Sequence, residues 1–164
     1  MSAAPRVAPG EDGGDIARQW EEWGSSRGEK RDRKTITDGR FDKAVREAEA
    51  MMRGGDWADA KPLHFVALYV VLHEGVYGVS PGELGPQQRL QACGFAHRLL
   101  KHEFDEEPAA MAAFVRWTWQ REKEREQWRR ANARSGGRIG WRLQFSGTLL
   151  TDYRIDCERR KGRR

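Results

Sequence analysis

The spacing of apolar residues predicts helices along most of the chain. Over residues 41–52 apolar side chains recur every three or four positions, the spacing of an amphipathic helix that the following Gly-Gly pair can end. Residues 63–72 are apolar on every face, as expected for a central, buried helix. A third helical stripe covers residues 86–104, and a fourth covers residues 108–133. We therefore expect a mainly α protein, built as a small helical domain of about four helices.

The last of these helices changes character along its length. Residues 111–118 place apolar side chains on one face, whereas residues 120–130 are nearly all charged apart from Trp128. Ion pairs four residues apart, such as Glu126 with Arg130, support a helix that is exposed on all sides. We therefore expect a long, charged last helix whose second half reaches into solvent.

The residues after this helix alternate between apolar and polar. Residues 138–145 alternate strictly, as in a half-buried β-strand, and residues 149–155 form a second alternating run. A loop of three residues, 146–148, would pair apolar residues on one face and pair Arg142 with Asp152 and Arg138 with Asp156 on the other. We therefore expect a C-terminal β-hairpin over residues 138–156, packed on the helices because an isolated hairpin is marginal in water.

A competing interpretation makes residues 148–158 a helix. Leu149, Leu150, Tyr153 and Cys157 fit helical spacing as well as they fit the strand pattern. The apolar pairs across the hairpin, such as Trp141 with Tyr153, favour the strands.

The first part of the chain has a different composition. Residues 1–35 are rich in Gly, Pro, Ser and charge, and they lack the apolar density that offsets the entropy of ordering. We expect a disordered N-terminal arm, or a weakly helical one, because Ile16, Trp20 and Trp23 fall at helical spacing. A single domain over residues 36–157 and a basic tail over residues 158–164 complete the predicted organisation.

The positive charge is concentrated in the C-terminal third. Residues 116–164 hold fifteen Arg or Lys and six Asp or Glu, a net charge of +9, whereas residues 1–115 carry a net charge of −4. A local positive field attracts polyanions through counterion release, or an acidic protein surface through steering. A solvated tail that favours solubility is an equally good interpretation of the charge alone.

The sequence contains no motif that fixes a reaction. It has no Gly-rich phosphate loop, no Gly-x-Ser-x-Gly elbow and no Cys-x-x-Cys pair. His73 and Glu74 begin like a zinc-protease helix, but Tyr77 occupies the position of the second histidine. Cys93 and Cys157 match no metal or disulfide spacing. We expect a protein that is not an enzyme and that holds no metal or cofactor.

Two further observations bear on location. The N-terminus lacks the apolar stretch of a secretory signal, and the longest apolar run, residues 65–72, is too short to span a bilayer. We therefore expect a cytoplasmic protein that has no membrane partner.

Arginine and tryptophan come together at the end of the long helix and in the turn after it. The planar fork of arginine binds phosphate oxygens in pairs, and the face of an exposed tryptophan stacks on a base. The Gly-containing turn over residues 134–138 lets the backbone approach a phosphate closely. The candidate nucleic-acid-binding residues are Arg125, Trp128, Arg129, Arg130, Arg134 and Arg138.

The order of a charged Trp-bearing helix, a basic turn and a short end rich in Leu, Phe and Tyr resembles the C-terminal modules of some phage replication-initiation proteins. The resemblance is confined to this part of the chain and implies a phage- or replication-associated role, without assigning residues. From the residues themselves we expect an accessory protein that binds DNA or RNA mainly through backbone phosphates. The alternative is a protein-interaction or assembly module that uses the N-terminal arm and exposed Trp residues.

Overall fold

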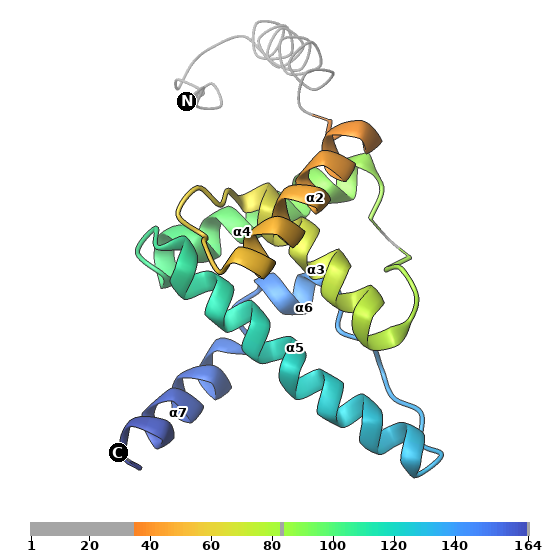
Figure 1. The fold of residues 1–164 in the computed structure, drawn as a ribbon, viewed down its shortest axis with the longest axis vertical. Helices are drawn as coiled ribbons and strands as arrows, with labels where there is room; N and C mark the ends of the chain where they lie inside the picture. The colour runs from red at the N-terminus through yellow and green to blue at the C-terminus, as the bar shows by residue number, and fades with distance from the viewer. Residues whose placement is uncertain (1–34, 83, 164) are drawn as a thin grey trace, which may run out of the picture. The chain divides into compact units, whose positions relative to one another are not determined.

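The computed structural model describes residues 35–82 and 84–163, and within these ranges the regular structure is entirely helical. Figure 1 shows the helices in chain order. The chain divides into two units between Thr35 and Ile36, and the described helices belong to the second unit. The arm predicted over residues 1–35, with its three apolar residues at helical spacing, lies outside the described residues apart from Thr35. The helices are α2 (Asp38–Gly54), α3 (Pro62–Tyr77), α4 (Pro86–Glu103), α5 (Pro108–Ala131), α6 (Trp141–Phe145) and α7 (Leu150–Lys161).

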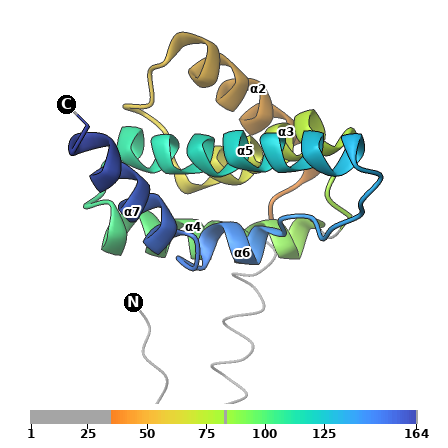
Figure 2. The same cartoon turned by 90° about the horizontal axis from the view of Figure 1, so that it is seen from below.

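Helix α3 lies at the centre of this unit because it is apolar on every face. It packs against α2, α4, α5 and α6, and side chains such as Phe65, Val66 and Leu68 are fully buried. Figure 2 shows the order of the layers, with α3 and α5 in the middle, α2 on one side, and α4 and α6 on the other. Helices α2 to α5 lie where the apolar spacing predicts them.

Specific residues begin and end these helices. Gly55 and Gly78 follow α2 and α3 in the left-handed conformation, with φ of 68° and 75°, where other residues are strained. At the start of α3 the backbone N–H of Lys61 donates to Nδ1 of His64 at 2.9 Å. Nε2 of the same ring therefore carries the proton and donates to Glu47 on α2 at 2.6 Å. One histidine thus caps α3 and joins it to α2.

The predicted β-hairpin over residues 138–156 is wrong. In the described residues this part of the chain contains no strand, and it forms α6, a left-handed turn at Gly147 (φ 84°) and α7. Trp141, Gln144 and Phe145 are buried, at the spacing of a helix, whereas Leu143 is 39% exposed. The loop expected at residues 146–148 exists, but it joins two helices.

The competing helical interpretation of residues 148–158 is confirmed as α7. Leu150 is buried, and the Tyr153 ring packs against the rings of Phe114 and Trp117, each with centroids 5.3 Å apart. Ile155, which the strand pattern placed on the buried face with Tyr153, is 46% exposed. Helix α7 continues to Lys161, so residues 158–161 of the predicted basic tail are helical.

Tertiary packing explains this outcome. The ring of Trp141 packs against Phe95 of α4 with centroids 5.5 Å apart, and α6 contacts both α4 and α3. A helix satisfies its own backbone hydrogen bonds, so two short helices can each bury one apolar side without a partner strand. The long charged helix, which we expected to be the last one, is α5. Two further helices, α6 and α7, follow it. Among residues 35–82 and 84–163, no helix combines the length and the apolar composition that a membrane-spanning segment requires.

Candidate nucleic-acid interface

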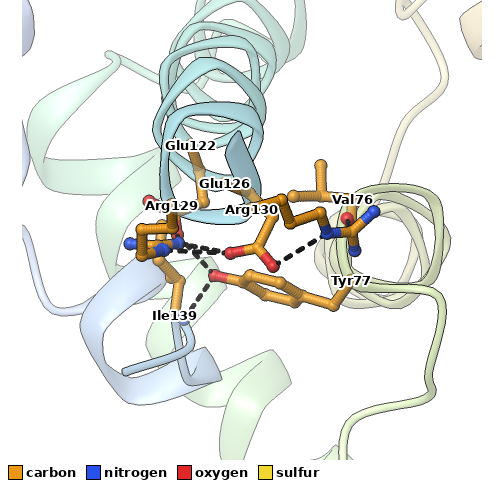
Figure 3. A network of polar contacts seen from close by, with 7 residues as sticks. All are labelled: Val76, Tyr77, Glu122, Glu126, Arg129, Arg130 and Ile139. Atoms are coloured by element: carbon orange, nitrogen blue, oxygen red, sulfur yellow. Dashed lines mark hydrogen bonds and ion pairs between the residues drawn. The ribbon is translucent and has the colours of Figure 1, made fainter. Parts of the chain in front are cut away.

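A buried polar network connects α3, the end of α5 and the segment before α6 (Figure 3). The Tyr77 hydroxyl donates to Oε1 of Glu122 at 2.9 Å and accepts from the backbone N–H of Ile139 at 2.9 Å. Arg129 donates to the same Glu122 oxygen at 2.5 Å and to Glu126 at 2.8 Å. Because the Glu122 side chain is only 4% exposed, its carboxylate takes its hydrogen bonds from these partners.

The network shifts the pKa of three of its side chains, those of Tyr77, Glu126 and Arg129. Burial raises the pKa of Tyr77, and the carboxylate of Glu122 beside it raises the pKa further. The hydrogen bond from Arg129 lowers the pKa of Glu126, and the bond to Glu122 raises the pKa of Arg129. All three groups are therefore held in the protonation state that they have at neutral pH.

The segment after α5 is fixed by the same network. The Tyr69 hydroxyl donates to the carbonyl oxygen of Ile139 at 2.9 Å, so hydroxyls from α3 bind both polar atoms of the Ile139 backbone. A Cβ added at Gly136 would lie 2.8 Å from Cδ of Arg129. Because Arg129 is tied to two carboxylates, it cannot easily move aside, and glycine allows the segment to pass over it.

Four of the six candidate residues line one open pocket of about 540 Å³, which we call the Trp128 pocket. Trp128 is 60% exposed, a large fraction for a side chain of its size. Arg125 stands on the same helix, and Arg134 comes from the segment that turns back after α5. The lining residues are Arg125, Trp128, Arg129, Arg134, Ser135 and Gly136.

The candidate arginines differ in whether a carboxylate neutralises their charge. Arg129 lines the Trp128 pocket but is neutralised by Glu122 and Glu126. Arg130 lies outside the pocket, where it pairs with Glu126 at 3.3 Å and donates to the carbonyl of Val76 at 3.4 Å. In the part of the chain that the structure describes, Arg125 and Arg134 form no ion pair. The pocket therefore offers one exposed tryptophan and two available guanidinium groups.

Arg138 lies outside the Trp128 pocket, with its guanidinium carbon 5.7 Å from the centre of the Tyr77 ring. The ion pairs that the hairpin assigned to Arg138 and Arg142 do not form. Asp152 lies 3.5 Å from Arg121, and Asp156 pairs with Arg160 at 2.9 Å.

Arg142 is not among the binding residues predicted from the sequence, because the strand register assigned it a carboxylate partner. Its guanidinium carbon lies 4.4 Å from the centre of the Trp141 ring. The helical interpretation of residues 148–158 removes Asp152 as the partner of Arg142. That interpretation is the feature of the sequence that indicated an unpaired charge at Arg142.

The described helices offer few residues for metal binding or for thiol chemistry. Within the described residues no group of three or more His, Cys, Asp or Glu side chains could hold a metal ion. Burial raises the pKa of the Cys93 thiol to about 11, so it is a poor nucleophile at neutral pH. Comparisons with known protein families, curated proteins and solved structures find no match to this chain.

Proposed function

We propose that this protein is a non-enzymatic accessory protein that binds nucleic acid at the Trp128 pocket. The observation that carries the proposal is the exposed Trp128 between Arg125 and Arg134, two arginines without a carboxylate partner among the described residues. A tryptophan in this position is costly to leave in water unless a ligand covers it.

The chemistry of the pocket suits a single strand. A base that is not paired can place its face on the indole of Trp128, which contributes about 1–3 kcal/mol per stacked base. The guanidinium groups of Arg125 and Arg134 bind backbone phosphates, which fixes the position of the strand without selecting its sequence. The excess of positive charge in residues 116–164 adds a field that increases the rate of association.

A direct test measures the affinity of labelled single- and double-stranded DNA and RNA over a salt series. We expect affinity to fall as salt rises, with a slope of about −0.7 per neutralised phosphate for a single strand. Trp128→Ala should weaken single-strand binding about 5- to 150-fold, the loss of one stacked base. Arg125→Ala and Arg134→Ala should each reduce the salt slope by about one phosphate contact.

The matched control is Arg116→Ala. Arg116 is exposed on the same helix and forms no ion pair in the described part of the chain, but it does not line the Trp128 pocket. It should cost much less affinity than Arg125→Ala. Binding that is independent of salt and unchanged by Trp128→Ala would contradict the proposal and favour the alternative, a protein-interaction module that uses exposed tryptophans.

A further inference from the structure

A second, smaller pocket lies where the segment before α6 crosses α3. It has a volume of about 220 Å³, and three separate parts of the chain line it: α3, the connection after α3 and residues 138–142. Pockets for drug-sized ligands have about 300–1,000 Å³, so this one suits a smaller molecule or one part of a larger ligand. We call it the Arg138 pocket, and the residues that matter in it are Tyr69, His73, Pro81, Arg138, Trp141 and Arg142.

Two guanidinium groups supply the charge of this pocket. Arg138 lies against the ring of Tyr77 and Arg142 against the ring of Trp141, at 5.7 Å and 4.4 Å from the ring centres. With the residues that the structure describes, neither forms an ion pair, and the residues lining the pocket include no Asp or Glu. Aromatic faces hold the planar groups while their N–H donors remain available. Two such guanidinium groups at one pocket favour a ligand with a doubly charged oxyanion.

The other walls are aromatic and neutral. Tyr69 and Trp141 are buried, and the Tyr69 hydroxyl is already bound to the carbonyl of Ile139. Nδ1 of His73 lies 2.7 Å from the carbonyl oxygen of Val79, so this nitrogen carries the proton. Burial lowers the pKa of His73, and the charge of Arg138 lowers it further. The neutral ring therefore keeps a lone pair on Nε2, which can accept a hydrogen bond from a ligand.

We propose that the Arg138 pocket binds a small organic phosphate, with the phosphate on Arg138 and Arg142 and the carbon part against Tyr69 and Trp141. The charge of the two arginines selects the phosphate, and the aromatic walls distinguish an organic phosphate from the inorganic ion. A free mononucleotide and the phosphorylated end of a strand share this chemistry. The pocket has no lining residue in common with the Trp128 pocket, so this inference does not depend on the proposed function.

The test uses the full chain, with inorganic phosphate, a nucleoside 5′-monophosphate and the unphosphorylated nucleoside as probes. Calorimetry measures affinity, and NMR follows the ring resonances of His73, which lines this pocket and not the Trp128 pocket. We expect the monophosphate to bind more tightly than inorganic phosphate and to shift the His73 resonances, and the nucleoside to do neither. The double variant Arg138→Ala, Arg142→Ala should weaken the monophosphate about ten-fold or more.

Both arginines are exposed, so the double variant should keep the helical circular dichroism spectrum of the parent chain. Arg116→Ala is the matched control, because it removes an exposed arginine that lines neither pocket and should leave monophosphate binding unchanged. Failure of both phosphates to bind, or equal binding by the double variant, would overturn the inference even if single-strand binding at Trp128 were demonstrated.

A final comparison separates the two sources of the phosphate. Oligonucleotides with a 5′-phosphate and with a 5′-hydroxyl are titrated against the wild type and the double variant. A preference for the 5′-phosphate that the double variant loses assigns the pocket to strand ends. Equal binding of the two oligonucleotides, together with monophosphate binding, assigns it to a free mononucleotide.

Discussion

The side chain of Arg129 is 16% exposed, and its guanidinium group donates hydrogen bonds to the carboxylates of Glu122 and Glu126. Glu122 is more deeply buried than Arg129, and its other hydrogen bond within the described residues comes from the Tyr77 hydroxyl. A buried carboxylate that loses its cation keeps the cost of desolvation without the attraction that offset it. The contribution of Arg129 is therefore to the stability of the fold.

Arg129→Ala should lower the free energy of unfolding by about 3–5 kcal/mol, because it leaves Glu122 buried and uncompensated. Urea unfolding measures this change. Arg125→Ala, one helical turn earlier on α5 and without an ion pair among the described residues, should change it by less than about 0.5 kcal/mol. Equal effects of the two substitutions would show that Glu122 does not need Arg129.

Gln144 is a polar side chain in an apolar place. It is fully buried on α6, and among the described residues neither its Nε2 nor its Oε1 has a hydrogen-bond partner. Gln144→Met keeps the length of the side chain and removes the unsatisfied amide, so it should raise the free energy of unfolding by about 1–3 kcal/mol. Thermal unfolding followed by circular dichroism would show this gain, and a loss of stability would show that a buried water binds the amide.

At the scale of elements, α7 can be tested through two neighbouring side chains that a strand and a helix treat differently. Tyr153 packs on Phe114 and Trp117, whereas Ile155 points to solvent. Tyr153→Ala should cost about 1.5–3 kcal/mol of stability and Ile155→Ala less than about 0.5 kcal/mol. In a strand both residues would share a face, and the two losses would be similar. Denaturant unfolding of both variants distinguishes the two structures.

Helices α2 to α5 could be predicted because their apolar spacing is a local property with one good explanation. The end of the chain could not, because residues 138–145 alternate strictly as in a strand and residues 148–158 fit the period of a strand and that of a helix. What decides between them is contact with α4 through Phe95, which sequence spacing does not reveal. The same holds at the candidate interface. Exposure of Trp128 followed from its charged surroundings, but the neutralisation of Arg129 depends on Glu122 being buried under Tyr77.

For the molecule as a whole, the buried tyrosines predict how stability depends on pH. Burial raises the pKa of Tyr69 from 10.0 to about 12, and it raises the pKa of Tyr77 as well. A group whose pKa is higher in the folded state contributes stability below its unfolded pKa and loses it as pH rises. The folded state should therefore become progressively less stable above about pH 10.

Denaturant unfolding at a series of alkaline pH values measures this loss, and tyrosinate absorbance follows the ionisation. Tyr77→Phe removes one of the groups whose pKa is raised, so the variant should start from lower stability but lose less of it between pH 10.0 and about 12. A wild-type stability that stayed constant over this interval would mean that neither tyrosine resists ionisation.

The pair of hydroxyls around Ile139 also has a consequence for hydrogen exchange. Residues 134–140 belong to no helix, and amides in such segments normally exchange with solvent quickly. The amide of Ile139 is different, since it donates to a buried tyrosine on α3 while its own carbonyl is bound by another. It should exchange as slowly as the amides of the central helix α3. The exchange rate of this one amide would then report on the opening of that helix.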